Sequence, residues 1–278
     1  MIPAEFEYVR AESVEEAVRH LRENGEDAKL LAGGHSLLPL MKLRLAAPTL
    51  LIDIGRIPGL HGVQENGSVT IGALTPHAAV ADAGLGLVSA AAQTIADQQV
   101  RNRGTLGGSL AHGDPASDMP AIMLAVEATF TVQGDGGTRE IAATDFFQDF
   151  LETALEPHEV LTEVRFPDLS GWGYGYEKFN RRQEDWAMVA VSALVRQEGG
   201  TVSDVRIGLT NMGQTPLRAT AAEAALRGQP LNAESIAAAA EQAAEGTNPP
   251  SDLNATQDYK RHLARVLCRR ALTQAAGG

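Results

Sequence analysis

The sequence is poor in cysteine, in basic charge and in long apolar runs. Its one cysteine, Cys268, cannot form an internal disulfide or supply the several thiolates that hold an iron–sulfur cluster. Lys and Arg number 23 against 35 Asp and Glu, a net charge of −12 that repels phosphate backbones and anionic lipid surfaces. No apolar run approaches the roughly 20 residues of a membrane-spanning helix. These shortages argue against nucleic-acid partners and an integral membrane segment.

The start of the chain and its composition indicate a cytoplasmic globular protein. Residues 1–18 have neither the basic start nor the apolar core of a secretory signal. The composition is 44% hydrophobic and 21% charged over 278 residues. Such a chain can bury a core as one large domain or as two domains of ordinary size.

Short strand and helix patterns are mixed along the whole chain, which predicts an α+β fold. Ser13 can cap a helix over residues 14–23, with Glu16 completing a capping box. Strand patterns follow at residues 29–32 and 50–54, so the chain opens like a β-α-β unit.

The middle of the chain alternates hairpin and helix signals. Asn66-Gly67 predicts a tight turn between two strands within residues 63–73, and Thr75-Pro76 predicts the start of a helix. Helical character at residues 90–97 precedes a polar, glycine-rich stretch over 98–118, which is interpreted as a long functional loop. Further strands are predicted at 129–133, 138–142 and 160–166.

The character of the sequence changes near residue 172, where glycines punctuate the chain. Three long strands are predicted beyond it, followed by alanine-rich helices and a last helix over residues 258–273; the strands are 174–180, 186–197 and 201–209. A domain boundary is therefore predicted there.

Two glycine-rich segments, residues 32–36 and 104–109, share one chemical character. Paired glycines let backbone N–H groups converge, and a neighbouring hydroxyl adds a donor, so each segment can bind phosphate. Two such sites facing one diphosphate would suit a dinucleotide. Neither segment has the lysine of a P-loop or the spacing of a Rossmann turn, and each glycine pair is also compatible with a plain turn.

Five motifs, taken together, resemble the FAD-binding medium subunit of the molybdenum hydroxylases, the carbon monoxide dehydrogenase and xanthine dehydrogenase family. They occur in the family's order and span nearly the whole chain. The motifs are LAGGHSLLP (31–39), TIGALT (70–75), GTLGGS (104–109), DPASDMP (114–120) and KFNRRQEDWA (178–187).

The resemblance implies a two-part architecture. Residues 1–171 would form an FAD-binding domain of the vanillyl-alcohol oxidase and p-cresol methylhydroxylase type, with subdomains at about 1–55 and 56–171. Residues 172–278 would form a smaller C-terminal domain with a three-stranded antiparallel sheet and helices.

The resemblance also implies the residues that hold FAD. The two glycine loops would bind the pyrophosphate through backbone donors, Asp118 would accept from sugar or ribityl hydroxyls, and Trp186 would cover the isoalloxazine ring where many members have tyrosine. The implied cofactor-binding residues are Ala32, Gly33, Gly34, His35, Ser36, Leu37, Thr105, Gly107, Gly108, Ser109, Asp118, Leu161, Lys178 and Trp186. No catalytic residue and no metal ligand is assigned in this chain.

The family role is electron transfer. Substrate would be hydroxylated at a molybdenum cofactor on a large subunit, electrons would cross two [2Fe–2S] clusters on a small subunit, and FAD on this chain would pass them to quinone, NAD or oxygen. The expected assembly is a dimer of heterotrimers in the cytoplasm, with contact to a membrane surface through the complex left open. A single cysteine fits this division, because the clusters must lie elsewhere.

Two alternatives stay open at this point. A self-contained flavin oxidoreductase, acting on a small molecule in its C-terminal domain, predicts turnover by the isolated chain. A cofactor-free scaffold subunit predicts a colourless protein. The substrate of the complex is also open among carbon monoxide, an N-heterocycle and an aromatic acyl thioester, because its chemistry would belong to another chain.

Overall fold

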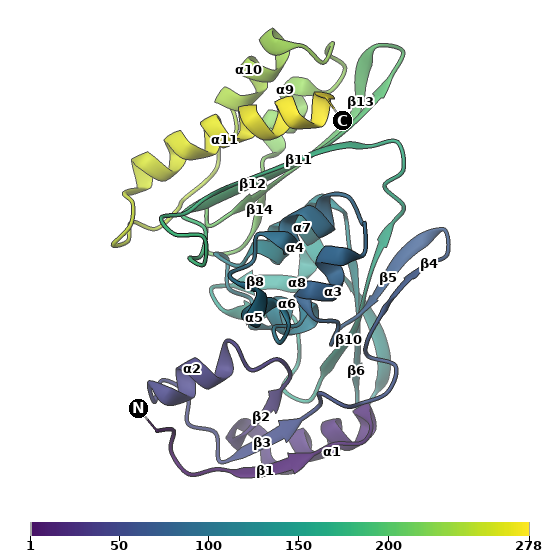
Figure 1. Cartoon of the computed structure of the whole chain (residues 1–278), viewed down its shortest axis with the longest axis vertical. Helices are drawn as coiled ribbons and strands as arrows, with labels where there is room; N and C mark the ends of the chain where they lie inside the picture. The colour runs from purple at the N-terminus through teal and green to yellow at the C-terminus, as the bar shows by residue number, and fades with distance from the viewer. Residues whose placement is uncertain (1, 278) are drawn as a thin grey trace.

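The N-terminal part of the chain builds a small parallel sheet, seen at the bottom of Figure 1. A computed structural model describes residues 2–277. The sheet has the order β1-β3-β2, and helix α1 connects β1 to β2; the bounds are β1 (Glu7–Arg10), α1 (Val14–Asn24), β2 (Ala28–Leu31) and β3 (Leu50–Asp53). Ser13 caps α1 by accepting from the Glu16 N–H at 3.2 Å. The Glu16 carboxylate accepts from the Glu12 N–H at 2.9 Å, so the predicted capping box is displaced by one residue.

A five-stranded antiparallel sheet forms the middle of the molecule. Its order is β4-β5-β10-β6-β7; the bounds are β4 (Val63–Glu65), β5 (Ser68–Gly72), β6 (Thr129–Gly134), β7 (Gly137–Ala142) and β10 (Val160–Pro167). Short helices pack beside the sheet (Figure 1), namely α3 (His77–Asp82), α4 (Leu87–Gln93), α5 (Gln98–Arg101), α6 (Leu106–His112), α7 (Asp118–Ala125) and α8 (Ala143–Phe146). A small hairpin of β8 (Phe147–Asp149) and β9 (Glu152–Thr153) completes this part. The predicted α+β character is confirmed.

Three local predictions in this part were wrong in detail. Helix α3 has Pro76 as its N-cap, because the Thr75 hydroxyl accepts from the Gly62 N–H at 2.9 Å and donates to its carbonyl at 3.1 Å. The helix predicted at residues 90–97 lies at Leu87–Gln93. The predicted loop over 98–118 contains α5 and α6, which are too short to give a clear periodicity.

The C-terminal part is an antiparallel sheet covered by helices on one face. The sheet has the order β11-β12-β13-β14, with bounds β11 (Gly173–Phe179), β12 (Val189–Glu198), β13 (Thr201–Thr210) and β14 (Leu217–Arg218). The covering helices are α9 (Thr220–Leu226), α10 (Ala233–Glu241) and α11 (Gln257–Gly277). The three long strands are present, but β14 extends the sheet to four, and Trp186 precedes β12 instead of lying in it. A two-residue strand carries no pattern that a sequence can reveal.

Glycines set how closely the C-terminal sheet approaches its neighbours. A Cβ on Gly173 or Gly175 of β11 would lie 2.0 or 2.1 Å from a carbonyl oxygen of α11. On β13, a Cβ on Gly208 would lie 2.4 Å from the Ala121 carbonyl oxygen of α7. The sheet is therefore in backbone contact with α11 and with the middle part of the molecule.

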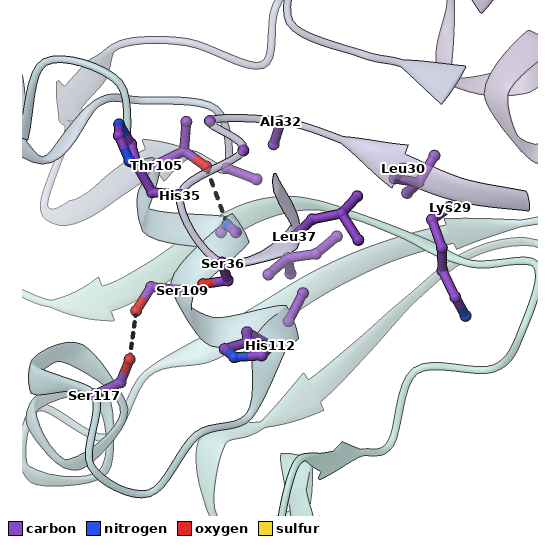
Figure 2. Close-up of a pocket in the computed structure, with 18 of the residues that line it drawn as sticks. Lys29, Leu30, Ala32, His35, Ser36, Leu37, Thr105, Ser109, His112 and Ser117 are labelled. Atoms are coloured by element: carbon purple, nitrogen blue, oxygen red, sulfur yellow. Dashed lines mark hydrogen bonds between the residues drawn. The ribbon is translucent and has the colours of Figure 1, made fainter. Parts of the chain in front are cut away.

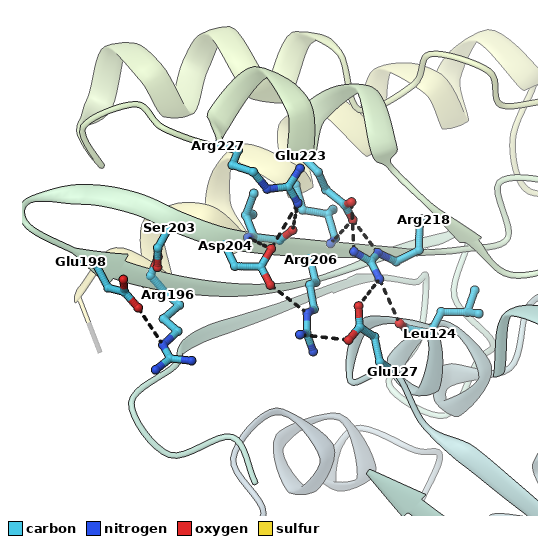
Figure 3. Close-up of polar contacts among 12 residues, drawn as sticks. Leu124, Glu127, Arg196, Glu198, Ser203, Asp204, Arg206, Arg218, Glu223 and Arg227 are labelled. Atoms are coloured by element: carbon cyan, nitrogen blue, oxygen red, sulfur yellow. Dashed lines mark hydrogen bonds and ion pairs between the residues drawn. The ribbon is translucent and has the colours of Figure 1, made fainter. Parts of the chain in front are cut away.

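An ionic cluster joins the end of α7 to the C-terminal sheet (Figure 3). Glu127, just beyond α7, accepts from Arg206 of β13 at 2.9 Å and lies 3.7 Å from Arg218 of β14. Arg218 also donates to the Leu124 carbonyl of α7 at 3.3 Å and makes a two-point pair with buried Glu223. The cluster fixes the C-terminal part on the helix that begins at Asp118.

Within residues 2–277, no helix combines the length and the apolar composition needed to cross a bilayer. The boundary at residue 172, and the division of the first domain near residue 55, stay predictions.

We expect Gly208→Ala to destabilise the protein by about 1–3 kcal/mol, the usual cost of overpacking, because backbone must move to admit the new methyl group. Urea unfolding measures the change. Gly136→Ala is the matched control, since nothing lies within 4 Å of its Cβ position. Equal stabilities of the two variants would contradict the backbone contact.

Candidate functional site

One cavity of about 950 Å³ lies where the three parts of the molecule meet, and it brings the whole predicted site together. Its walls come from both glycine loops, from α6 and α7, and from β10 and β11. Figure 2 shows the part of the wall formed by the two glycine loops and α6. Every residue predicted for the site lines this cavity: Ala32, Gly33, Gly34, His35, Ser36, Leu37, Thr105, Gly107, Gly108, Ser109, Asp118, Leu161, Lys178 and Trp186.

The first glycine loop presents free backbone donors. It connects β2 to the short helix α2 (Leu37–Lys42), and Gly34 has φ +76°, which a side chain rarely tolerates. Among residues 2–277, no acceptor bonds the N–H groups of residues 33–37. These adjacent donors line the cavity and form a site suited to an anion.

The second glycine loop differs from the prediction, because the N–H groups of residues 106–109 are already bonded within the protein. The Gly107 N–H donates to the Ala73 carbonyl at 2.7 Å, and the Gly108 N–H donates to the Thr105 hydroxyl at 3.2 Å. The Ser109 N–H donates to the Thr105 carbonyl at 3.0 Å. The polar groups left to this loop are the Thr105 N–H, which has no acceptor among the described residues, and hydroxyls, of which Ser109 Oγ lies 3.2 Å from Ser117 Oγ (Figure 2).

The two loops pack directly on one another. A Cβ on Gly33 would lie 2.2 Å from the Arg103 carbonyl oxygen, so only glycine permits the first loop to lie against the chain entering the second. A Cβ on Gly107 would lie 2.5 Å from the Cβ of Ala73, so the second loop lies equally close to the exit of β5. These glycines serve the protein's own packing.

Asp118 and Lys178 form a buried ion pair in the cavity wall. The two charged ends are 3.0 Å apart, and their side chains are 7% and 6% exposed. Tyr176, which the sequence did not indicate, donates to the other Asp118 oxygen at 2.9 Å. Burial raises the pKa of Asp118, against the opposing effects of Lys178 and the Tyr176 hydrogen bond.

His77 is a second cavity residue without an assigned role in the sequence. Its ring is buried, and its Nδ1 has no hydrogen-bond partner in the described part of the chain. Burial, together with the neighbouring charge of His35, lowers the pKa of His77 to about 4. The imidazole is therefore neutral near pH 7, and it lies against Gly104 of the second loop.

The two predicted apolar contacts occupy different settings. Leu161 on β10 is buried in the core of the middle part, so packing alone would explain it. Trp186 lies at the cavity with 52% of its surface exposed. A half-exposed indole beside a cavity is suited to cover a planar ligand.

We expect Asp118→Asn to change how stability depends on pH. A carboxyl whose pKa is raised on folding stabilises the folded state most below its unfolded value of 3.8, and this contribution is lost as the pH rises through the folded value. Asparagine does not titrate, so the Tm of wild type minus that of Asp118→Asn should fall as the pH rises from about 4 towards neutrality. Exposed Asp82→Asn is the control. A difference that grows with pH would contradict the raised pKa.

Two family models together match nearly the whole chain. Residues 4–169 match the FAD binding domain in molybdopterin dehydrogenase, and residues 174–275 match the CO dehydrogenase flavoprotein C-terminal domain.

Curated relatives and solved structures agree with the family models. The medium chain of carbon monoxide dehydrogenase from Hydrogenophaga pseudoflava is 47% identical over 99% of this chain and 98% of its own length. The nicotine 6-hydroxylase medium subunit of Paenarthrobacter nicotinovorans is 38% identical with the same coverage. A solved carbon monoxide dehydrogenase from H. pseudoflava, which lacks the Mo-pyranopterin moiety of the molybdenum cofactor, superposes with a TM-score of 0.97 at 48% identity and covers 100% of this chain and 99% of that one. The chain therefore belongs to the FAD-binding medium subunits of the carbon monoxide dehydrogenase and xanthine dehydrogenase family, the flavoprotein subunits of molybdenum hydroxylases.

Proposed function

We propose that the cavity of about 950 Å³ holds FAD, with its diphosphate on the first glycine loop. The observation that carries this placement is the run of N–H groups at residues 33–37 that lack acceptors among the described residues. Ligand pockets span about 300–1,000 Å³, so the cavity is at the large end of that range and suits a dinucleotide. Adjacent backbone donors are the arrangement that phosphate oxygens favour.

The second loop contributes hydroxyls and shape in this proposal. Thr105 and Ser109 would donate to phosphate or sugar oxygens, while Gly107 and Gly108 allow the loops to close. Asp118 and Lys178 would bind the polar chain between phosphate and ring. Leu37 and Leu161 would supply apolar contact.

The bound FAD would supply reversible two-electron chemistry, and the chain would bind, orient and tune it. Trp186 would cover one face of the isoalloxazine ring and exclude water there. His77 is neutral near pH 7 and would add no positive charge to the cavity wall.

Electrons must reach this chain from another subunit. Cys268 is the one cysteine of the chain and is buried, so the chain cannot supply the several thiolates that a cluster needs. We therefore propose that a small subunit with two [2Fe–2S] clusters delivers electrons from the molybdenum site of a large subunit. The FAD would pass them to quinone, NAD or oxygen, and the assembly would be a dimer of heterotrimers. A cytoplasmic location also stays a prediction.

In this proposal, the large subunit determines the substrate of the complex. Relatives of similar coverage are named as subunits of a carbon monoxide dehydrogenase and of a nicotine 6-hydroxylase, so one medium-chain fold accompanies different substrates. Membership of an FAD-binding family removes the alternative of a cofactor-free scaffold. The self-contained oxidoreductase differs from the proposal by requiring no partner.

Gly108→Val should weaken FAD binding at least tenfold, or about 1.4 kcal/mol. The new side chain would begin 2.7 Å from Thr105 Oγ1 and point towards Ala32 of the first loop, so it would displace the hydroxyl and narrow the space between the loops. Titration of apoprotein with FAD, followed by visible absorbance, measures the affinity. Gly136→Val is the control at an open position. Full retention of FAD by folded Gly108→Val would contradict the proposed role of the second glycine loop in FAD binding.

The isolated chain should be yellow but unable to oxidise carbon monoxide or an N-heterocycle with a dye as acceptor. The same chain purified with its native partners should contain molybdenum, iron and FAD and should turn over substrate. Metal analysis and a dye-linked assay on both preparations distinguish the cases. Turnover by the isolated chain would favour the self-contained oxidoreductase.

A further inference from the structure

A second, open groove of about 510 Å³ lies behind the wall of the main cavity. Its rim carries exposed polar side chains of the β11–β12 loop, including Arg181 and Gln183, and its floor includes Thr94 and Tyr176. Lys178 lines both this groove and the main cavity. One side chain therefore separates a space open to water from the proposed flavin site.

The ammonium group of Lys178 is bonded on both sides of this wall. It donates to the carboxylate of Asp118 at 3.0 Å and to the Thr94 carbonyl at 3.2 Å. Asp118 lines the main cavity, and Thr94 lines the groove. Tyr176 holds the remaining Asp118 oxygen at 2.9 Å, so the carboxylate has a fixed orientation.

We propose that Lys178 and Asp118 form a proton-transfer pair, which carries protons between water in the groove and the group bound in the main cavity. This inference rests on the proposed placement of FAD. Two-electron reduction of a flavin takes up protons, whereas electron carriers such as iron–sulfur clusters deliver electrons alone. A chain that receives electrons from clusters therefore needs a separate supply of protons.

The burial of the pair makes the transfer feasible. A low-dielectric site penalises both charges, and moving one proton from Nζ to the carboxylate removes both at once. Burial also raises the pKa of Asp118, in the direction that favours the neutral acid. Burial and the neighbouring Asp118 raise the pKa of Tyr176 well above 10, so Tyr176 keeps its proton and acts as a positioning residue.

The transfer is balanced for protons and moves no electrons through these side chains. Lys178 first gives a proton to the Asp118 carboxylate along the 3.0 Å hydrogen bond, Asp118 then gives that proton to the cavity, and groove water restores the ammonium group. Each cycle moves one proton inwards and leaves both residues unchanged. The reverse sequence returns a proton to water when the bound group is reoxidised by the external acceptor.

The test is flash reduction of FAD in the full chain, in weakly buffered solution with a pH-indicator dye. Flavin absorbance follows the arrival of electrons, and the dye follows proton uptake. In the wild type the two should coincide. In Asp118→Asn, proton uptake should lag at least tenfold behind reduction, and formate, a small weak acid, should restore it, which a purely structural role would not predict.

Two further variants keep the test decisive. Lys178→Gln should show the same lag, and it serves as the test if Asp118→Asn does not retain FAD. Tyr176→Phe should produce a smaller lag, because the pair itself remains. Glu177→Gln is the control, since Glu177 lies on the same strand and lines the groove but bonds to Gln274 instead of Asp118.

The outcomes separate this inference from the proposed function. A wild-type chain that binds no FAD would overturn the proposed function, and the proton route with it. FAD retention with proton uptake as fast as wild type in Asp118→Asn and Lys178→Gln would overturn the route alone, and would mean that protons enter directly through the mouth of the main cavity.

Discussion

The cavity exists because two stretches of backbone, about seventy positions apart, touch without side chains between them. Gly33 places the first loop against the Arg103 carbonyl, and Gly107 seats the second loop on Ala73. Hydrogen bonds from Leu106 to Thr75 and from His77 to Gly104 secure the second loop to the exit of β5. With the loops fixed in this way, the donors of the first loop face a space of defined width, and every other site residue is placed relative to it.

The C-terminal part completes the cavity instead of providing a separate site. Strand β11 contributes Lys178, which reaches Asp118 at the start of α7. The other end of the same helix is held by the cluster around Glu127 and Arg218 (Figure 3), and Gly208 brings β13 against its middle. Helix α7 therefore contacts the C-terminal part at both ends and in the middle. These contacts explain how the Asp118–Lys178 ion pair, which joins two parts of the chain, can stay buried.

Local signals in the sequence predicted much of the fold. The turn at Asn66-Gly67 and the cap at Ser13 depend on neighbouring residues only, and both are present. The start of α3 was predicted one residue too early, because Thr75 bonds to Gly62, a tertiary contact that competes with capping. Tyr176 was missed for the same reason, since its role depends on Asp118, 58 positions away. The glycine motifs located the cavity, but whether their N–H groups were free depended on distant carbonyls such as that of Ala73.

The two glycine loops differ in their hydrogen bonding, so they should differ in rigidity when no ligand is bound. The second loop is held by hydrogen bonds from Leu106 and Gly107 to the exit of β5, so it needs no ligand to hold its shape. The N–H groups of the first loop have no acceptors among the described residues, so its amides should exchange with solvent most easily when no ligand is bound. Under the proposed placement of FAD, binding would order the amides of the first loop alone, so the ordering entropy would be small and FAD could enter a chain that has already folded.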